Sequence, residues 1–226
     1  MIILLCVSSS SLLAKDLIPI GIAVAVFILN VIYQEYNRRN NISDKISSEV
    51  VSTCDKMTRY AIEIEYSALA WQYWKKMKHF FPYSRDENKE TYKESAAETT
   101  YYHRKSEDAG LKLDLLKSEL KKNTKDLLKY WPHELQSRQI IALMSTAVLI
   151  EPRRFEGIFD DLNINEMQTE YTNLTANVQN ETIFNGIGFE LVSIQKLIDP
   201  KSPTLFLNYE DEQKLIAKIQ IENKYS

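Results

Sequence analysis

The chain has 226 residues, of which 44% are hydrophobic, and its formal net charge is −3. Two cysteines exclude a fold framed by disulfides, and the length allows one ordinary domain or two small ones. Five glycines and six prolines are too few for a turn-rich sheet protein. We therefore expect an all-α protein.

The segment from Leu17 to Tyr33 is the most apolar part of the sequence, and Asn30 is its only strongly polar side chain. At ~1.5 Å rise per residue, a helix of this length covers about 26 Å, close to the ~30 Å hydrocarbon core of a bilayer. The sequence therefore predicts a single transmembrane helix at residues 17–34, preceded by a short non-cytoplasmic N-terminus at residues 1–16.

Charged residues beside this segment predict its orientation. Arg38, Arg39 and Lys45 follow the segment, whereas Lys15 and Asp16, whose charges cancel, precede it. Because basic residues accumulate on the cytoplasmic side of a membrane helix, the C-terminal part is expected in the cytoplasm. A cleaved signal peptide is the alternative, although no basic residue precedes the apolar run.

Apolar residues then recur at steps of three or four between Ile42 and Trp71, without an intervening proline. This spacing is typical of a helix. The transmembrane helix is expected to continue into a long helical stalk at residues 35–82. A cytoplasmic helical bundle is then expected at residues 83–226.

Helical patterns also occur within this C-terminal part. The run from Ile140 to Ile150 is too short to cross a membrane, so it is predicted to be the central helix of the soluble core. Glycines within 185–188 are expected to permit a bend or close helix packing. The other predicted helical stretches are 87–106, 111–131, 165–198 with the interruption at 185–188, and 210–222.

Two features of the apolar segment favour self-association. Gly21 and Ala25 are four residues apart, a spacing that lets membrane helices approach closely, and Asn30 can form a hydrogen bond between helices. Gln34 and Asn37 continue the polar row at steps of four and three. In a symmetric bundle, Asn30, Gln34 and Asn37 could line a hydrated pore. The alternative is a monomeric anchor whose last turn enters the headgroups.

Residues 71–85 interleave aromatic and basic side chains, a combination that can stack bases and neutralise phosphates. A row of lysines on a later helix could extend such a surface. The alternative is an apolar helix face that packs within the protein while the lysines remain in solvent. The candidate polyanion-binding residues are Trp71, Trp74, Lys75, Lys76, Lys78, Arg85, Lys117, Lys121 and Lys125.

The sequence gives no pattern for catalysis, for a metal site or for a cofactor. No two of the three histidines have the i, i+4 spacing of a zinc helix, and the cysteines do not form a Cys-x-x-Cys pair. We therefore expect a protein that is not an enzyme.

A short N-terminal anchor, a small cytoplasmic helical domain and a composition rich in Asn, Lys and Ile resemble the membrane-acting effector subunits of bacterial anti-phage defence systems. The resemblance implies a single-pass oligomer that permeabilises the inner membrane when its cytoplasmic domain senses a nucleotide or nucleic-acid signal. The expected partners are the lipid bilayer, further copies of the chain, an oligonucleotide or nucleotide ligand, and a protein partner in a membrane complex. A non-catalytic scaffold or accessory subunit of such a complex is the alternative.

Overall fold

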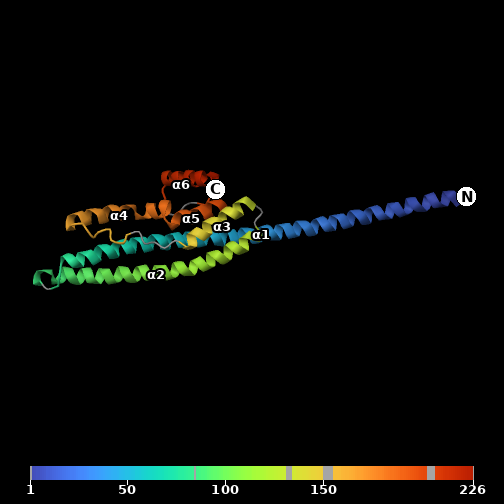
Figure 1. The fold of residues 1–226 in the computed structure, drawn as a ribbon. Coiled ribbons are helices and arrows are strands. Elements are labelled where there is room, and N and C mark those ends of the chain that lie inside the picture. Colours follow the sequence, from blue (N-terminus) through green and yellow to red (C-terminus); the bar gives the residue numbers. More distant parts are fainter. Residues whose placement is uncertain (1, 84, 131–133, 150–154, 203–206, 226) are drawn as a thin grey trace. The chain divides into compact units, whose positions relative to one another are not determined.

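The computed structural model describes residues 2–83, 85–130, 134–149, 155–202 and 207–225, with side chains described from residue 22 except at 134–135, 148–149 and 223–225. Within these ranges the chain forms six α-helices and one short 3-10 helix, so the all-α prediction is confirmed (Figure 1). The elements are α1 (Ile2–Phe80), η1 (Asp86–Asn88), α2 (Lys89–Leu128), α3 (Glu134–Leu149), α4 (Ile164–Asn185), α5 (Ile187–Ile198) and α6 (Tyr209–Tyr225).

The chain divides into two units, Met1–Lys45 and Ile46–Ser226. The boundary lies N-terminal to the one expected between stalk and bundle at residue 82. The second unit includes residues 46–80 of α1, for which the sequence analysis expected a stalk. Val50 and Met57 in this part of α1 are fully buried, because other helices cover its apolar face.

In the first unit, the apolar side chains of residues 22–33 are exposed. Over the part of the chain with described side chains, no helix combines the length and apolar content that crossing a bilayer requires. The predicted transmembrane helix begins at Leu17. Its first residues, including the packing candidate Gly21, lie outside the described side chains.

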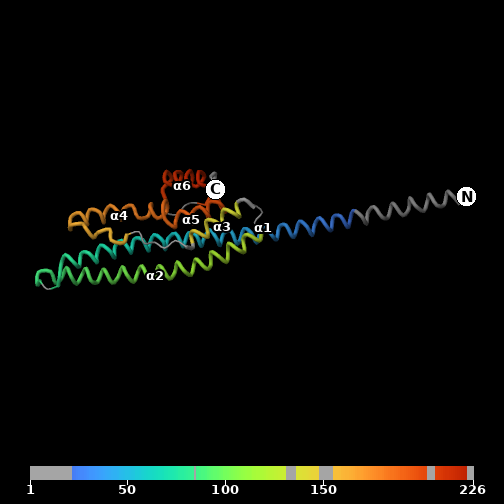
Figure 2. The backbone as a smooth tube through the Cα atoms, viewed as in Figure 1, coloured from blue at the N-terminus to red at the C-terminus, as the bar shows by residue number. Residues whose placement is uncertain are grey.

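Helices α1 and α2 pair in antiparallel directions, as the backbone trace also shows (Figure 2). The Trp71 ring lies 5.4 Å from the His103 ring, and the Lys112 ammonium lies 5.6 Å from the Tyr60 ring. The residue numbers of the contacts on α1 therefore decrease as those on α2 increase, which is the pattern of an antiparallel pair. The two predicted stretches 87–106 and 111–131 form one 40-residue helix, α2.

Helix α1 contributes side chains to all three apolar clusters of the second unit, either as buried members or as residues packed against them. The largest cluster joins α1 with α2, α3 and α5. Residues Phe155 and Phe159 join α1 and α4 in the second cluster. In the third, α6 packs on α4 and α5 through Leu215 and Ile219.

The central position predicted for the run from Ile140 is wrong, because α1 and α5 hold that place. Ile140 and Ala147 of α3 are buried, but the Ile141 side chain is 45% exposed. Ile150, the end of the run, lies outside the described residues. Helix α3 is therefore amphipathic and covers one side of the core.

Candidate functional site

A buried carboxylate lies where α1 meets α4. Glu65 on α1 is 3% exposed, and its Oε2 accepts a hydrogen bond of 2.7 Å from Thr182 Oγ1. The same Thr182 oxygen lies 2.7 Å from the Val178 carbonyl oxygen within α4. A buried carboxylate is costly without donors, so this bond fixes how α4 lies against α1.

The α4–α5 junction packs closely against this carboxylate. Gly186 ends α4 and begins α5. A Cβ atom at Gly186 would lie 3.0 Å from the Thr182 carbonyl oxygen and 3.3 Å from Glu65 Oε1. At Gly188 it would lie only 2.7 Å from the same carbonyl oxygen. The interruption predicted at residues 185–188 is confirmed, and its two glycines permit close packing.

Except for the exposed Tyr83, the aromatic residues of the 71–85 run pack within the protein. Tyr73 and Met77 are buried, and Trp74, Phe80 and Phe81 pack against the same cluster. Trp71 is half-buried against His103. Stacking of these rings on a ligand would therefore compete with their existing contacts.

The basic residues of this run differ in their surroundings. Lys75 is exposed, with its ammonium 5.1 Å from the Trp71 ring, and Arg85 is exposed beyond the turn. Lys76 donates a hydrogen bond of 2.6 Å to the Asp160 carbonyl oxygen, and Lys78 is half-buried. A pocket of about 340 Å³ lies beside Lys75, Lys76 and Asp160.

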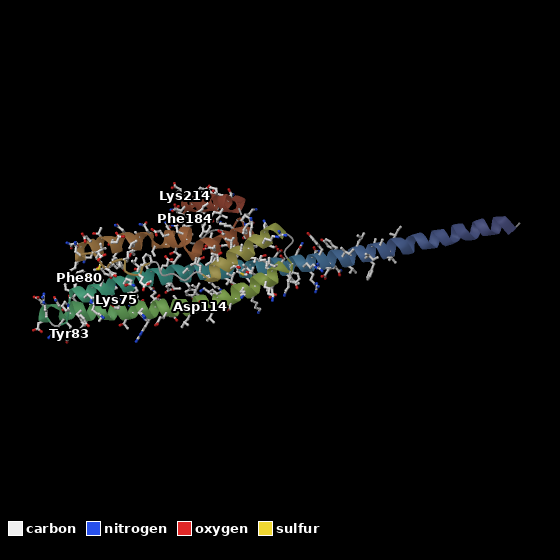
Figure 3. All side chains as sticks on the ribbon, viewed as in Figure 1. Lys75, Phe80, Tyr83, Asp114, Phe184 and Lys214 are labelled. Atoms are coloured by element: carbon white, nitrogen blue, oxygen red, sulfur yellow. The ribbon has the colours of Figure 1, made fainter. Side chains whose placement is uncertain are left out.

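The lysine row on α2 is separate from this run. Lys117 pairs with Asp114 at 3.1 Å, whereas Lys121 and Lys125 are exposed. Figure 3 shows Lys75 toward the turn between α1 and α2, and Asp114 further along α2. Since His103 marks the level of Trp71, 14 to 22 residues of α2 separate that level from the row, about 21–33 Å at ~1.5 Å per residue. The structure does not join the two sets into one patch.

The candidate pore residues Asn30, Gln34 and Asn37 lie in the first unit, as does the packing candidate Ala25. Ala25, Asn30 and Gln34 are exposed and Asn37 is half-buried. The neighbouring carboxylate of Glu35 accepts hydrogen bonds from the Nε atoms of Arg38 and Arg39 at 2.8 Å and 3.1 Å. The C-terminal end of the polar row therefore lies beside the ion pairs of Glu35 with Arg38 and Arg39.

Sequence reasoning missed a groove where α1, α2 and α4 meet. It has a volume of about 500 Å³, and Arg59, Glu63 and Tyr66 of α1 face Lys105 of α2 across it. Spacing along any one helix could not reveal this groove, because its side chains come from segments up to about 120 residues apart.

The second unit also contains a buried thiol. Cys54 is fully buried, and burial raises the pKa of its thiol, so it packs as an apolar side chain. Among the side chains that the structure describes, no three His, Cys, Asp or Glu residues are grouped so as to hold a metal ion.

No protein-family model, no curated protein and no solved structure matches the chain.

Proposed function

We propose that the protein is a membrane-anchored oligomeric effector that permeabilises the inner membrane under the control of a cytoplasmic helical unit. The exposed apolar side chains of residues 22–33 support this proposal best. Val26, Phe27, Ile28 and Leu29 are all exposed, Phe27 by 68% and Leu29 by 64%. Four consecutive helical positions, each turned about 100° from the last, surround the helix. Lipid or other apolar helices suit such a surface better than water does.

Asn30, Gln34 and Asn37 give this segment a polar row at helical spacing. In a symmetric oligomer, each copy would turn its row toward a shared axis, where water and ions could pass. The ion pairs of Glu35 with Arg38 and Arg39 would lie at the cytoplasmic end of that axis. This arrangement supports permeabilisation rather than simple anchoring.

The exposed basic residues of the second unit support a polyanionic signal. Lys75, Arg85, Lys121 and Lys125 are exposed on two separate surfaces. Such side chains attract phosphates, and their contribution to binding decreases as salt concentration rises.

Ion flux through liposomes tests the proposal. The unmodified full-length protein should release an entrapped ion, and Asn30→Leu should reduce that release at equal protein incorporation, because an apolar lining wets poorly. Val31→Leu adds bulk off the polar row and should leave flux unchanged. Absence of flux from the unmodified protein, both without added ligand and with a nucleotide or a single-stranded oligonucleotide present, would reject the effector proposal.

A non-catalytic scaffold of a membrane complex is the second candidate, favoured by the packing of Trp71 and Trp74 within the bundle. A scaffold should retain its membrane attachment after Asn30→Leu, or attach more firmly, since a polar amide has been removed from an apolar segment. Ala25→Ile should lower the oligomer number in detergent if close helix contacts form there. Partner capture without any flux would decide for the scaffold.

A further inference from the structure

The groove between α1, α2 and α4 has the size and the mixed chemistry of a small-molecule site. Its volume of about 500 Å³ falls within the ~300–1,000 Å³ typical of ligand pockets. Three helices supply its walls, so a bound molecule would touch elements distant in the sequence. The lining includes Arg59, Ile62, Glu63, Tyr66, Lys105, Gln179 and Asn180.

Two cationic side chains and one carboxylate line the groove. Arg59 is exposed, and the Lys105 side chain is 34% exposed. Lys105 Nζ lies 3.7 Å from Glu63 Oε1, longer than the ~2.7–2.9 Å of a charge-assisted hydrogen bond. Glu63 therefore holds Lys105 loosely. Among the lining side chains, the two cations Arg59 and Lys105 outnumber the single carboxylate of Glu63, and Asp55, one turn before Arg59 on α1, also interacts electrostatically with Arg59.

The rest of the lining suits an aromatic ring with polar edges. Ile62 and the Tyr66 ring supply apolar surface, and the side-chain amides of Gln179 and Asn180 can both donate and accept hydrogen bonds. The rings of Tyr66 and Tyr102 lie 6.3 Å apart, edge to face, which fixes the Tyr66 ring in place. A base could pack here while its edges reach the amides.

We propose that this groove binds a small nucleotide, with the phosphate between Arg59 and Lys105 and the nucleoside against Tyr66 and the amides of α4. The role of this nucleotide as the signal for permeabilisation rests on the function proposed above. Its binding, however, can be measured without any flux. Because α4 contributes to the groove, an occupied groove would hold α4 against the α1–α2 pair.

Isothermal titration of AMP into the full-length protein in detergent micelles tests the site. AMP should bind at least about tenfold more tightly than adenosine or inorganic phosphate, since each of these offers only part of the recognised chemistry. Arg59→Gln and Lys105→Gln should each weaken AMP binding by about tenfold, as expected for loss of a hydrogen bond to a charged group.

Two further variants make the test specific. Lys93→Gln removes an equal charge from an exposed position of α2 about 18 Å from Lys105 at ~1.5 Å per residue, and should leave AMP affinity unchanged. Glu63→Gln removes the carboxylate that competes for Lys105 and should tighten AMP binding, a gain that misfolding cannot produce. Circular dichroism should show native helix content in every variant.

The results separate this site from the effector function. Absence of AMP binding, or equal loss with Lys93→Gln, overturns the nucleotide site whatever the flux assay shows. Binding of inorganic phosphate as tight as that of AMP also overturns it, because the nucleoside would then contribute nothing. Specific AMP binding without flux supports the groove and rejects only the effector proposal.

Discussion

The packing of the α4–α5 junction predicts opposite effects for the same substitution at two helical glycines. Gly110 lies inside α2, and a Cβ atom added there would meet nothing within 4 Å. Gly188 lies in the first turn of α5, where the added Cβ atom would meet the Thr182 carbonyl oxygen at 2.7 Å and Ile183 Cα at 3.0 Å. Both of these atoms belong to the backbone of α4, so they cannot move aside by rotating a side chain.

The magnitudes follow from these distances. In a helix interior, alanine is more stable than glycine by roughly 0.5–1 kcal/mol. Gly110→Ala should therefore raise the free energy of unfolding by this full amount. At Gly188 the last turn of α4 must shift, and overpacking of this kind costs about 1–3 kcal/mol. Because 2.7 Å is far inside van der Waals contact, the cost should approach its upper limit and leave a net loss of about 2 kcal/mol.

Thermal unfolding followed by far-ultraviolet circular dichroism measures both variants in the same detergent. For a chain of this size, 1 kcal/mol shifts Tm by about 2–4 °C, so Gly188→Ala should lower Tm by about 4–8 °C. Gly110→Ala should raise it by about 1–4 °C. A Gly188→Ala protein at least as stable as the unmodified one would refute the close approach of α4 and α5.

Two predictions concern carboxyl groups, the buried Glu65 and the half-buried Glu190. Thr182→Val should destabilise the protein by about 1–3 kcal/mol in urea titrations, because the buried Glu65 carboxylate loses the hydrogen bond from Thr182. Thr182→Ser keeps the hydroxyl, and equal losses in both variants would contradict this reasoning. Burial raises the pKa of Glu190 above its ordinary value of 4.5, so the folded state binds this proton more strongly than the unfolded state. The stabilisation of the folded state by this proton binding is fully present below pH 4.5 and is lost as pH rises through the folded-state pKa. The Glu190→Gln protein should thus be more stable than the unmodified protein at pH 7 but not at pH 4. If the free energies of unfolding of the two proteins changed in parallel with pH, the effect of burial on Glu190 would be contradicted.

The fold class and several helix boundaries could be predicted from the sequence, because these properties depend on local chemistry. Few glycines and prolines predicted helices, and the glycines at 186 and 188 marked the break between α4 and α5. Asn163 and Glu166 form a capping box at the start of α4, with both hydrogen bonds at 3.0 Å. This Asn-x-x-Glu pattern could have placed that start without any structure.

Tertiary position was harder to predict from local pattern. The apolar spacing along residues 46–80 fits a stalk that packs on another copy as well as it fits a core helix, since both bury one face. The groove was also hidden, because Arg59, Lys105 and Asn180 share no sequence motif. Only the pairing of α1 with α2 and the docking of α4 bring them together.

The hydrogen bond between Glu65 and Thr182 joins positions 117 residues apart, which has a consequence for synthesis on the ribosome. Helices α1 and α2 can pair as soon as both have emerged, but α4 is translated much later. Until then Leu69 and Met77 lack the cover that Met167 and Val178 later provide, and Glu65 remains hydrated. An incompletely translated chain therefore exposes an aggregation-prone apolar surface next to a charged group. Nascent chains of this protein should accordingly depend on chaperones until α4 has left the exit tunnel.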